Sequence, residues 1–331
     1  MEFHETTSTN AISVQGLTKR FSEIQAVSNL TFDTRKGELF GFLGPNGAGK
    51  TTTINMLTGL ARPDTGRIRI GGMDCTQNPK AAQHLIGVVP DDSNLYPELT
   101  GLENLCFCGA LYGMRKKARG TRARQLLKEF GLADAANRKF GGYSRGMKRR
   151  LTIAAGIIHK PEILFLDEPT SGIDVSSARR IRQLITELHR SGTTIFLTTH
   201  YIEEAERLCQ RIAFMVRGTL VKTDTVSRLL QPVQRRHVMR LSVSGAKPPL
   251  LGTLVSAFPD LTFQDLGSGL IRVEADEPVN VGPLVRIVED QGVVVTEARR
   301  MQLSLEDVFV NVTGIEATAM KKEKEKAGGR P

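Results

Sequence analysis

A glycine-rich segment near residue 44 restricts this chain to folds that wrap a short loop around a phosphate. Its glycines permit a tight turn in which successive backbone N–H groups point inward. Lys50 can reach the β- and γ-phosphates of a nucleotide, and the Thr51 hydroxyl can bind Mg²⁺. The segment follows the pattern G-x-x-x-x-G-K-S/T and consists of Gly44, Pro45, Asn46, Gly47, Ala48, Gly49, Lys50, Thr51 and Thr52.

The residues on either side of this segment fit a strand, a loop and a helix in succession. Residues 38–43 are a short, largely apolar run that ends at the loop, which is typical of a buried strand. A helix is expected over Lys50 to Leu60, and its positive N-terminal end faces the same site. This context favours a bound nucleotide over a glycine turn without a ligand.

The length of 331 residues predicts about two domains, and the hydrophobic content of 40% is sufficient for ordinary cores. The four cysteines form neither a C-x-x-C pair nor a metal-binding set with histidine, so we expect reduced thiols in a cytosolic protein. The longest uncharged run, residues 6–18, is too short and polar to span a bilayer. Residues 1–10 lack the features of a signal peptide, and we expect a disordered leader there.

The net charge of +10 admits nucleic acid, anionic lipid or an acidic protein as a neighbour. Much of this charge is local, because residues 115–124 contain six lysines and arginines. No aromatic residue is interleaved with them, as a platform for single-stranded nucleic acid requires. A solvated helix face and a contact with a membrane surface both remain open for this cluster.

The chain up to residue 225 alternates strands and helices. A capping box at Thr100 predicts a helix to Tyr112, and a second helix is expected over residues 120–130. They belong to a helical subdomain, about residues 95–160, inserted between the phosphate loop and the next strand. Strands are expected at residues 12–17, 67–70, 85–89, 163–166 and 194–199, with 67–70 and 85–89 extending the same sheet.

Two acids end the apolar strand at residues 163–166, and buried acids are costly unless a positive group meets them. In a phosphate-loop fold this position lies beside the loop, so Asp167 can hold Mg²⁺ and Glu168 can polarise a water molecule. A turn with solvated acids is the alternative.

The ordered motifs of this chain resemble those of an ATP-binding-cassette ATPase, and the resemblance covers roughly residues 11–225. It rests on residues 44–51, 143–147, 166–168, 171–174 and 199–200, whose order and spacing are specific to that family. The resemblance implies an α/β phosphate-loop NTPase cassette with a helical subdomain.

The resemblance also implies a role for individual residues. Lys50 and Thr51 bind the phosphates and Mg²⁺, Asp167 holds the metal, Glu168 is the general base, and His200 touches the γ-phosphate. Phe21 stacks on adenine in this scheme, although by itself it is an ordinary core aromatic.

A further set of residues is implied to act on nucleotide bound to a second cassette. Ser144 caps a helix over residues 147–158, and with Gly146 it contacts the γ-phosphate in trans, while Asp174 lies at the same two-fold contact. A single copy of every motif therefore predicts an isologous dimer, with a homodimer favoured. The chain departs from the family at Arg145, where glycine is usual, and at Met147, where glutamine is common.

Asp91 stands where the family usually has a glutamine that reaches Mg²⁺. A carboxylate is a hard oxygen ligand suited to Mg²⁺, so we predict that Asp91 senses the metal, through a bridging water that makes up the missing length. The alternative is that Asp91 and Asp92 are solvated turn residues after Pro90.

Residues 237–315 are expected to form a small α+β domain of a different kind. Strands and helices in the order βαββαβ suggest a ferredoxin-like module, and an amphipathic helix follows over residues 304–312. Residues 304–309 also resemble the closing segment of drug-exporter cassette subunits. We expect residues 316–331 to be a disordered, charged tail. The module either braces the cassette pair or docks on a regulator or the membrane chain, and bracing is favoured because the polar strand faces show no ligand motif.

Together these features predict the ATPase subunit of a membrane transporter, an exporter by resemblance, with Mg²⁺ as cofactor and ATP as substrate. Its expected partners are a separate transmembrane permease and a second cassette, at the cytoplasmic face of the membrane, with no nucleic acid. The alternative is a soluble cassette ATPase that acts on ribosomes or DNA.

Overall fold

The structure is a computed structural model that describes residues 10–234, 237–244, 250–301 and 304–315. Its contacts divide the chain after Thr225, and Val226–Gly314 forms a second compact unit. Apart from Asn10, the predicted leader lies outside the described residues, as does the predicted tail at 316–331. Asn10 belongs to the first strand and not to a disordered leader.

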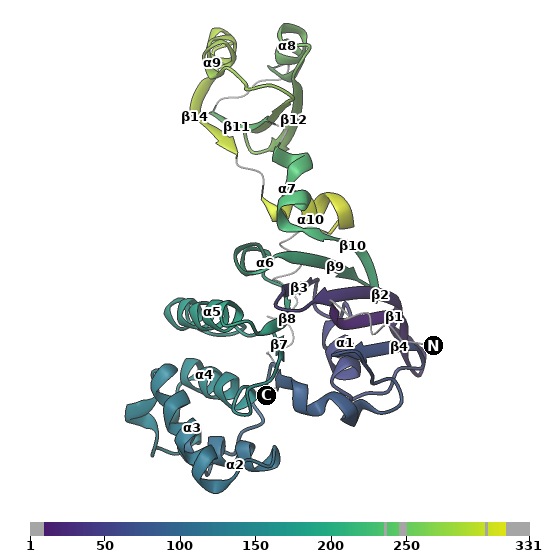
Figure 1. The fold of residues 1–331 in the computed structure, drawn as a ribbon. Helices are drawn as coiled ribbons and strands as arrows, with labels where there is room; N and C mark the ends of the chain where they lie inside the picture. Colours follow the sequence, from purple (N-terminus) through teal and green to yellow (C-terminus); the bar gives the residue numbers. More distant parts are fainter. Residues whose placement is uncertain (1–9, 235–236, 245–249, 302–303, 316–331) are drawn as a thin grey trace. The chain divides into compact units, whose positions relative to one another are not determined.

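A six-stranded sheet forms the centre of the first unit (Figure 1). All neighbouring strands in it are parallel except the edge strand β10, which is antiparallel to β9. Every residue of β3, β7 and β8 is buried, as expected for parallel strands that are covered on both faces. The strand order is β10 (Thr219–Thr225), β9 (Arg211–Val216), β3 (Leu39–Leu43), β8 (Thr194–Thr199), β7 (Ile163–Asp167) and β6 (Ile86–Val89).

A second, antiparallel sheet has the order β2 (Ile24–Arg35), β1 (Asn10–Phe21), β4 (Thr65–Ile70) and β5 (Met73–Asp74). The prediction that residues 67–70 and 85–89 share one sheet is wrong, because β4 pairs with β1 whereas β6 joins the parallel sheet. Apolar periodicity identifies a strand but not the strand with which it pairs. Phe32 of β2 lies 5.8 Å from Phe40 and 5.4 Å from Phe42 between ring centroids, so the two sheets share a core.

Three helices follow strands of the parallel sheet and begin where the functional motifs lie. α1 (Lys50–Leu57) follows β3, α5 (Val175–Arg190) comes after β7, and α6 (Ile202–Leu208) follows β8. Within the described ranges, no helix combines the length and the apolarity needed to cross a lipid bilayer.

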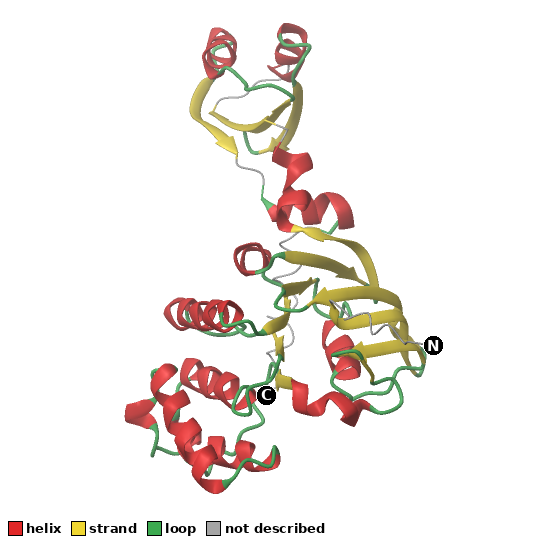
Figure 2. Ribbon diagram, in the orientation of Figure 1, coloured by secondary structure: helices red, strands yellow, loops and turns green. Residues whose placement is uncertain are grey.

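The helices α2 (Gly101–Leu111), α3 (Lys116–Glu129) and α4 (Arg145–Gly156) form a separate helical group (Figure 2). Thr100 begins α2 with the predicted capping box, since its side chain accepts from the Glu103 N–H and Glu103 accepts from the Thr100 N–H. α3 begins four residues before the predicted start at 120. Short 3₁₀ helices lie at Pro79–Leu85, Ala133–Ala135 and Phe140–Gly142.

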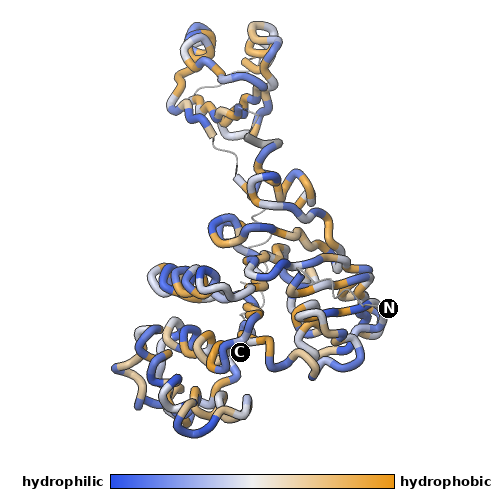
Figure 3. The backbone as a smooth tube through the Cα atoms, viewed as in Figure 1, coloured by the Kyte–Doolittle hydropathy of each residue, from blue (hydrophilic) through white to orange (hydrophobic). Residues whose placement is uncertain are grey.

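The second unit contains a four-stranded antiparallel sheet in the order β12 (Thr262–Gly267), β13 (Leu270–Ala275), β11 (His237–Ser244) and β14 (Val294–Met301). α8 (Leu250–Ala257) and α9 (Val281–Asp290) share a buried apolar core with this sheet, and the hydrophobic residues of these elements are visible in Figure 3. The elements therefore follow the order βαββαβ. Two flanking helices, α7 (Val226–Gln234) and α10 (Leu305–Thr313), contact one another. α7 was not predicted from the sequence.

Candidate active site

The loop between β3 and α1 adopts a backbone that only glycine can provide at two of its positions. A Cβ atom at Gly44 would lie 2.1 Å from the Met215 carbonyl oxygen. Gly49 has a φ of 101°, and a Cβ there would lie 2.4 Å from the Ala26 carbonyl oxygen. Gly44 and Gly49 are therefore required by close backbone packing, in addition to the room that a phosphate needs.

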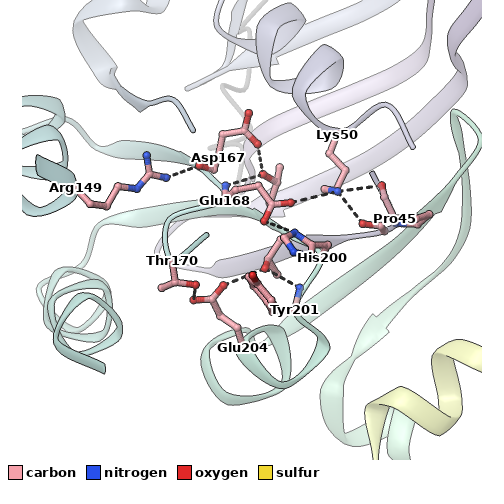
Figure 4. A network of polar contacts seen from close by, with 12 residues as sticks. Pro45, Lys50, Arg149, Asp167, Glu168, Thr170, His200, Tyr201 and Glu204 are labelled. Carbon is pink, nitrogen blue, oxygen red and sulfur yellow. Dashed lines mark hydrogen bonds and ion pairs between the residues drawn. The ribbon is translucent and has the colours of Figure 1, made fainter. Parts of the chain in front are cut away.

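Lys50 lies at the first position of α1, and its side chain turns back into the loop (Figure 4). Its Nζ donates to the carbonyl oxygens of Gly44 at 2.7 Å and Pro45 at 3.1 Å. The same nitrogen lies 3.3 Å from Glu168 Oε1, and both side chains are buried. The ammonium is thus oriented by the loop and by a carboxylate at the end of the neighbouring strand.

Glu168 follows β7 and forms the centre of the polar contacts in Figure 4. Its second oxygen, Oε2, lies 2.7 Å from His200 Nδ1, and the Glu168 backbone has a φ of 48°. Burial raises the pKa of Glu168, but the hydrogen bond from His200 and the Lys50 charge outweigh burial and bring this pKa below its usual value. A proton acceptor is therefore kept ionised between a lysine and a histidine.

A cavity of about 430 Å³ opens onto the phosphate loop. Asp91 and Glu168 line it from two other loops, whereas Asp92 is not among its lining residues. The cavity is also lined by residues that no sequence motif marks, namely Ile24, Gln25, Ala26, Arg217 and Gly218. The phosphate-loop residues that line the cavity are Asn46, Gly47, Gly49, Lys50, Thr51 and Thr52.

Asp167 is buried at the end of β7 and does not line this cavity. Its Oδ1 accepts a hydrogen bond from the Thr198 hydroxyl on the neighbouring strand. Among the residues predicted to bind Mg²⁺, Thr51 and Asp91 line the cavity and Asp167 does not.

A buried carboxylate that was not predicted from the sequence connects α6 to the end of β8 and to the segment that follows β7. Glu204 of α6 accepts hydrogen bonds from the Thr170 hydroxyl at 2.7 Å and from the Thr199 hydroxyl at 3.0 Å (Figure 4). Burial raises the pKa of Glu204. In the sequence, the only hint is its place between Ile202 and Ala205, two apolar residues of a helix that follows His200.

Phe21 is the last residue of β1 and is half-exposed, with 51% of its surface accessible. Lys19 Nζ lies 5.2 Å from its ring centroid. Phe21 is not among the residues that line the cavity, but its strand partner Ile24 is. The ring therefore belongs to the hairpin beside the cavity and is accessible to a flat ligand.

Ser144, Gly146 and Asp174 lie together and do not line the cavity. Ser144 caps α4 by accepting from the Met147 N–H at 3.3 Å, and Asp174 caps α5 by accepting from the Ser177 N–H at 2.9 Å. A Cβ at Gly146 would lie 3.8 Å from Asp174 Oδ2. Ser144 and Asp174 are exposed, whereas Gly146 is buried against Ser177. The three residues form one patch at the start of two helices, and its exposed members are Ser144 and Asp174.

The fold and the site define a phosphate-loop NTPase, since a parallel sheet carries the phosphate loop, an acid pair and a histidine at the ends of neighbouring strands. The sequence family described as "ABC transporter" matches residues 27–171. The chain is 35% identical over 305 residues to the linearmycin resistance ATP-binding protein LnrL of Bacillus subtilis, a match that covers 92% of this chain and 98% of that protein. The chain belongs to the ATP-binding subunits of ABC transporters.

Other relatives and solved structures agree with this assignment. The daunorubicin/doxorubicin resistance ATP-binding protein DrrA of Streptomyces peucetius is 36% identical, with 92% of this chain and 93% of that protein covered. A fluoroquinolones export ATP-binding protein of Mycobacterium tuberculosis is 38% identical, with coverage of 94% and 95%. A solved structure of an ATP-binding subunit of an ABC transporter matches with a TM-score of 0.62 and 28% identity, and the match covers 68% of this chain and 93% of that chain.

A dimeric ATP-binding cassette in a post-hydrolysis state, bound to ADP and Pi, has a TM-score of 0.61 at 28% identity, with 65% of this chain and 98% of that chain covered. The predicted phosphate-loop cassette is therefore confirmed, and the chain is an ATPase coupled to transport. Subunits of this family dimerise and work with a separate membrane permease. These relatives give no support to the alternative of an ATPase that acts on ribosomes or DNA.

Proposed function

We propose that this chain binds ATP with Mg²⁺ in the cavity beside the phosphate loop and hydrolyses it to drive export through a separate permease. The observation that carries the proposal is the series of contacts from Lys50 through Glu168 to His200, in which Lys50 and Glu168 line that cavity. Lys50 binds the phosphates, Glu168 accepts the proton of the attacking water, and His200 orients the γ-phosphate and the base.

The oxygen atoms at the cavity suit Mg²⁺, which prefers hard ligands and usually retains water and substrate phosphates in its shell. Within the described part of the chain, no three His, Cys, Asp or Glu side chains form a metal-binding group. A cation here therefore needs nucleotide oxygens beside the Thr51 hydroxyl, with Asp91 and Asp167 acting directly or through water. When bound, Mg²⁺ neutralises part of the charge that develops on the phosphates.

The patch of Ser144, Gly146 and Asp174 is proposed to meet nucleotide held by a second copy of the chain. The first N–H groups of an α-helix have no carbonyl partner within the helix and its dipole makes this end positive, so the start of α4 suits a γ-phosphate. Because this patch lies outside the cavity of its own cassette, two copies in a two-fold pair complete two identical sites. Phe21 is proposed to stack on the adenine of its own site.

Export is supported by the relatives, two of which are named resistance ATP-binding proteins and one an export ATP-binding protein. A position at the cytoplasmic face of the membrane is proposed from the expected contact with a permease. The second unit is proposed to be a ferredoxin-like module that braces the cassette pair. Its strand order β12-β13-β11-β14 with two helices on one apolar core supports this classification.

Mixed dimers test the shared site. A Lys50→Ala chain and a Ser144→Ala chain are each expected to be inactive, and an equimolar mixture should recover ATPase activity, because both lesions fall on one composite site and leave the other intact. Unchanged inactivity of mixtures shown to contain heterodimers contradicts shared sites. Purification of the full chain with its permease in detergent, followed by ATP-dependent export from vesicles, tests the transport role.

A further inference from the structure

Arg149 is a buried charge to which the proposed function assigns no role. It lies in α4, five residues after Ser144, and only 6% of its surface is exposed. Its Nε donates to the Pro169 carbonyl oxygen at 2.9 Å, and its Nη2 donates to the Asp167 carbonyl oxygen (Figure 4). Its Nη1 donates to the Asp91 carbonyl oxygen at 3.0 Å and to that of Pro90.

The acceptors of Arg149 belong to two catalytic segments. Pro90 and Asp91 follow β6, and Asp91 lines the cavity. Asp167 and Pro169 flank Glu168, whose carboxylate lies between Lys50 and His200. One rigid guanidinium therefore fixes the backbone of the loop that bears Asp91 and of the loop that bears the general base.

A guanidinium is suited to this task because its donors project in one plane and in fixed directions. Burial lowers the pKa of Arg149, but the carboxylates of Asp91, Asp167 and Glu168 act in the opposite direction. Neutral side chains of similar volume could fill the same space without the cost of burying a charge. Arg149 instead donates four hydrogen bonds to backbone carbonyl oxygens, which indicates that it fixes the position of these loops in addition to filling space.

The other end of the same helix segment holds the exposed Ser144 and the buried Gly146. Five residues of α-helix span only about 7.5 Å, so the segment moves as a rigid body. A displacement of the α4 start by a partner cassette is therefore carried by Arg149 to the Asp91 loop and the Glu168 loop.

We propose that Arg149 is a positioning residue that ties the partner-facing start of α4 to the two loops that hold the hydrolysis site of its own cassette. This inference rests on the proposed function, since it assumes hydrolysis at Glu168 and a dimer that uses Ser144. Arg149 touches neither nucleotide nor the reacting atoms in this scheme.

The neighbouring Arg150 provides a matched control. Arg150 is on the same helix and donates to the carbonyl oxygens of Phe130 at 2.7 Å and Gly131 at 3.2 Å, which both belong to the helical group. It also donates to the Gly146 carbonyl oxygen of its own helix at 3.4 Å. Arg150→Met therefore removes hydrogen bonds between a partly buried arginine and carbonyl oxygens without releasing either catalytic loop.

The first measurement compares ATP affinity and turnover of the two full-length variants. For Arg149→Met we expect kcat to fall by about 10²-fold, the effect of a misplaced catalytic group, while ATP affinity by calorimetry stays within about twofold. Arg150→Met should keep kcat within about threefold. If kcat per folded molecule falls equally in both variants, Arg149 only packs the helix and the proposal is wrong. If Arg149→Met does not fold, Arg149→Lys, which keeps the charge but not the planar fork, should show the same selective loss of kcat.

The second measurement locates the effect within the dimer. In a heterodimer with one Lys50→Ala chain, only the chain with intact Lys50 hydrolyses ATP. When Arg149→Met is placed in the chain with intact Lys50, most of the remaining turnover should be lost. When Arg149→Met is placed in the Lys50→Ala chain, most of the remaining turnover should persist. An equal loss from both placements overturns the inference. Failure of the wild-type dimer to hydrolyse ATP would instead refute the proposed function.

Discussion

Replacement of Gly146 by alanine separates two reasons for glycine at this position. An ideal Cβ at Gly146 lies 2.3 Å from Ser177 Oγ and 2.6 Å from Ser177 Cβ. The hydroxyl can rotate away, but Ser177 Cβ is fixed to the backbone of α5. Because carbon atoms prefer a separation of about 3.5–4.0 Å, α4 and α5 must move apart by roughly 1 Å.

The expected cost follows from this displacement. Overpacking of a tight contact destabilises by about 1–3 kcal/mol, and the better helix propensity of alanine returns up to about 1 kcal/mol. We therefore expect a loss of about 1–2 kcal/mol in the free energy of unfolding, or roughly 2–8 °C in Tm for a unit of this size. Gly120→Ala on α3, where the nearest atom to the new Cβ is Arg124 Nη1 at 3.6 Å, should be neutral or stabilising.

Denaturant unfolding of Gly146→Ala, Ser177→Gly and the double variant tests the reasoning. Ser177→Gly removes the atoms that clash, so the double variant should be more stable than the sum of the single changes by at least about 1 kcal/mol. Additivity within about 0.5 kcal/mol would refute the packing argument. A double variant that is stable but inactive in the dimer would show that glycine is also required at the contact with the partner's nucleotide.

Four further changes probe the site. Glu168→Gln should keep ATP binding and lose about 10²–10⁴-fold in turnover, because an amide cannot accept the proton of water; turnover at the wild-type rate in the assembled transporter would exclude Glu168 as the base. Lys50→Ala should weaken ATP binding in calorimetry by removing the cation that faces the phosphates, and unchanged affinity contradicts this role. Asp91→Ala should raise the Mg²⁺ concentration for half-maximal activity whereas Asp92→Ala should not, and identical titrations would leave both as solvated turn residues. Glu204→Ala should cost about 1–3 kcal/mol in unfolding experiments for each of the two hydroxyls it leaves without an acceptor, and a variant as stable as wild type would show that these bonds contribute little.

The local chemistry of this protein was determined by the sequence. The phosphate loop requires its own glycines and Lys50 within nine consecutive residues, and Ser144 caps the helix that directly follows it. The capping box at Thr100 is equally local, because its donors and acceptors are three residues apart. Such features depend on backbone geometry over one or two turns, which periodicity and spacing report directly.

Contacts between distant segments were decided only by the tertiary structure. The pairing of β4 with β1, the stack of Phe32 on the parallel sheet and the hydroxyl bonds of Glu204 each join segments whose partners no local pattern specifies. Arg149 shows the same limit most clearly, since its carbonyl acceptors lie as far as 59 residues away in the chain. Backbone carbonyls are present at every residue, so no sequence signal marks those that a folded chain brings to one guanidinium.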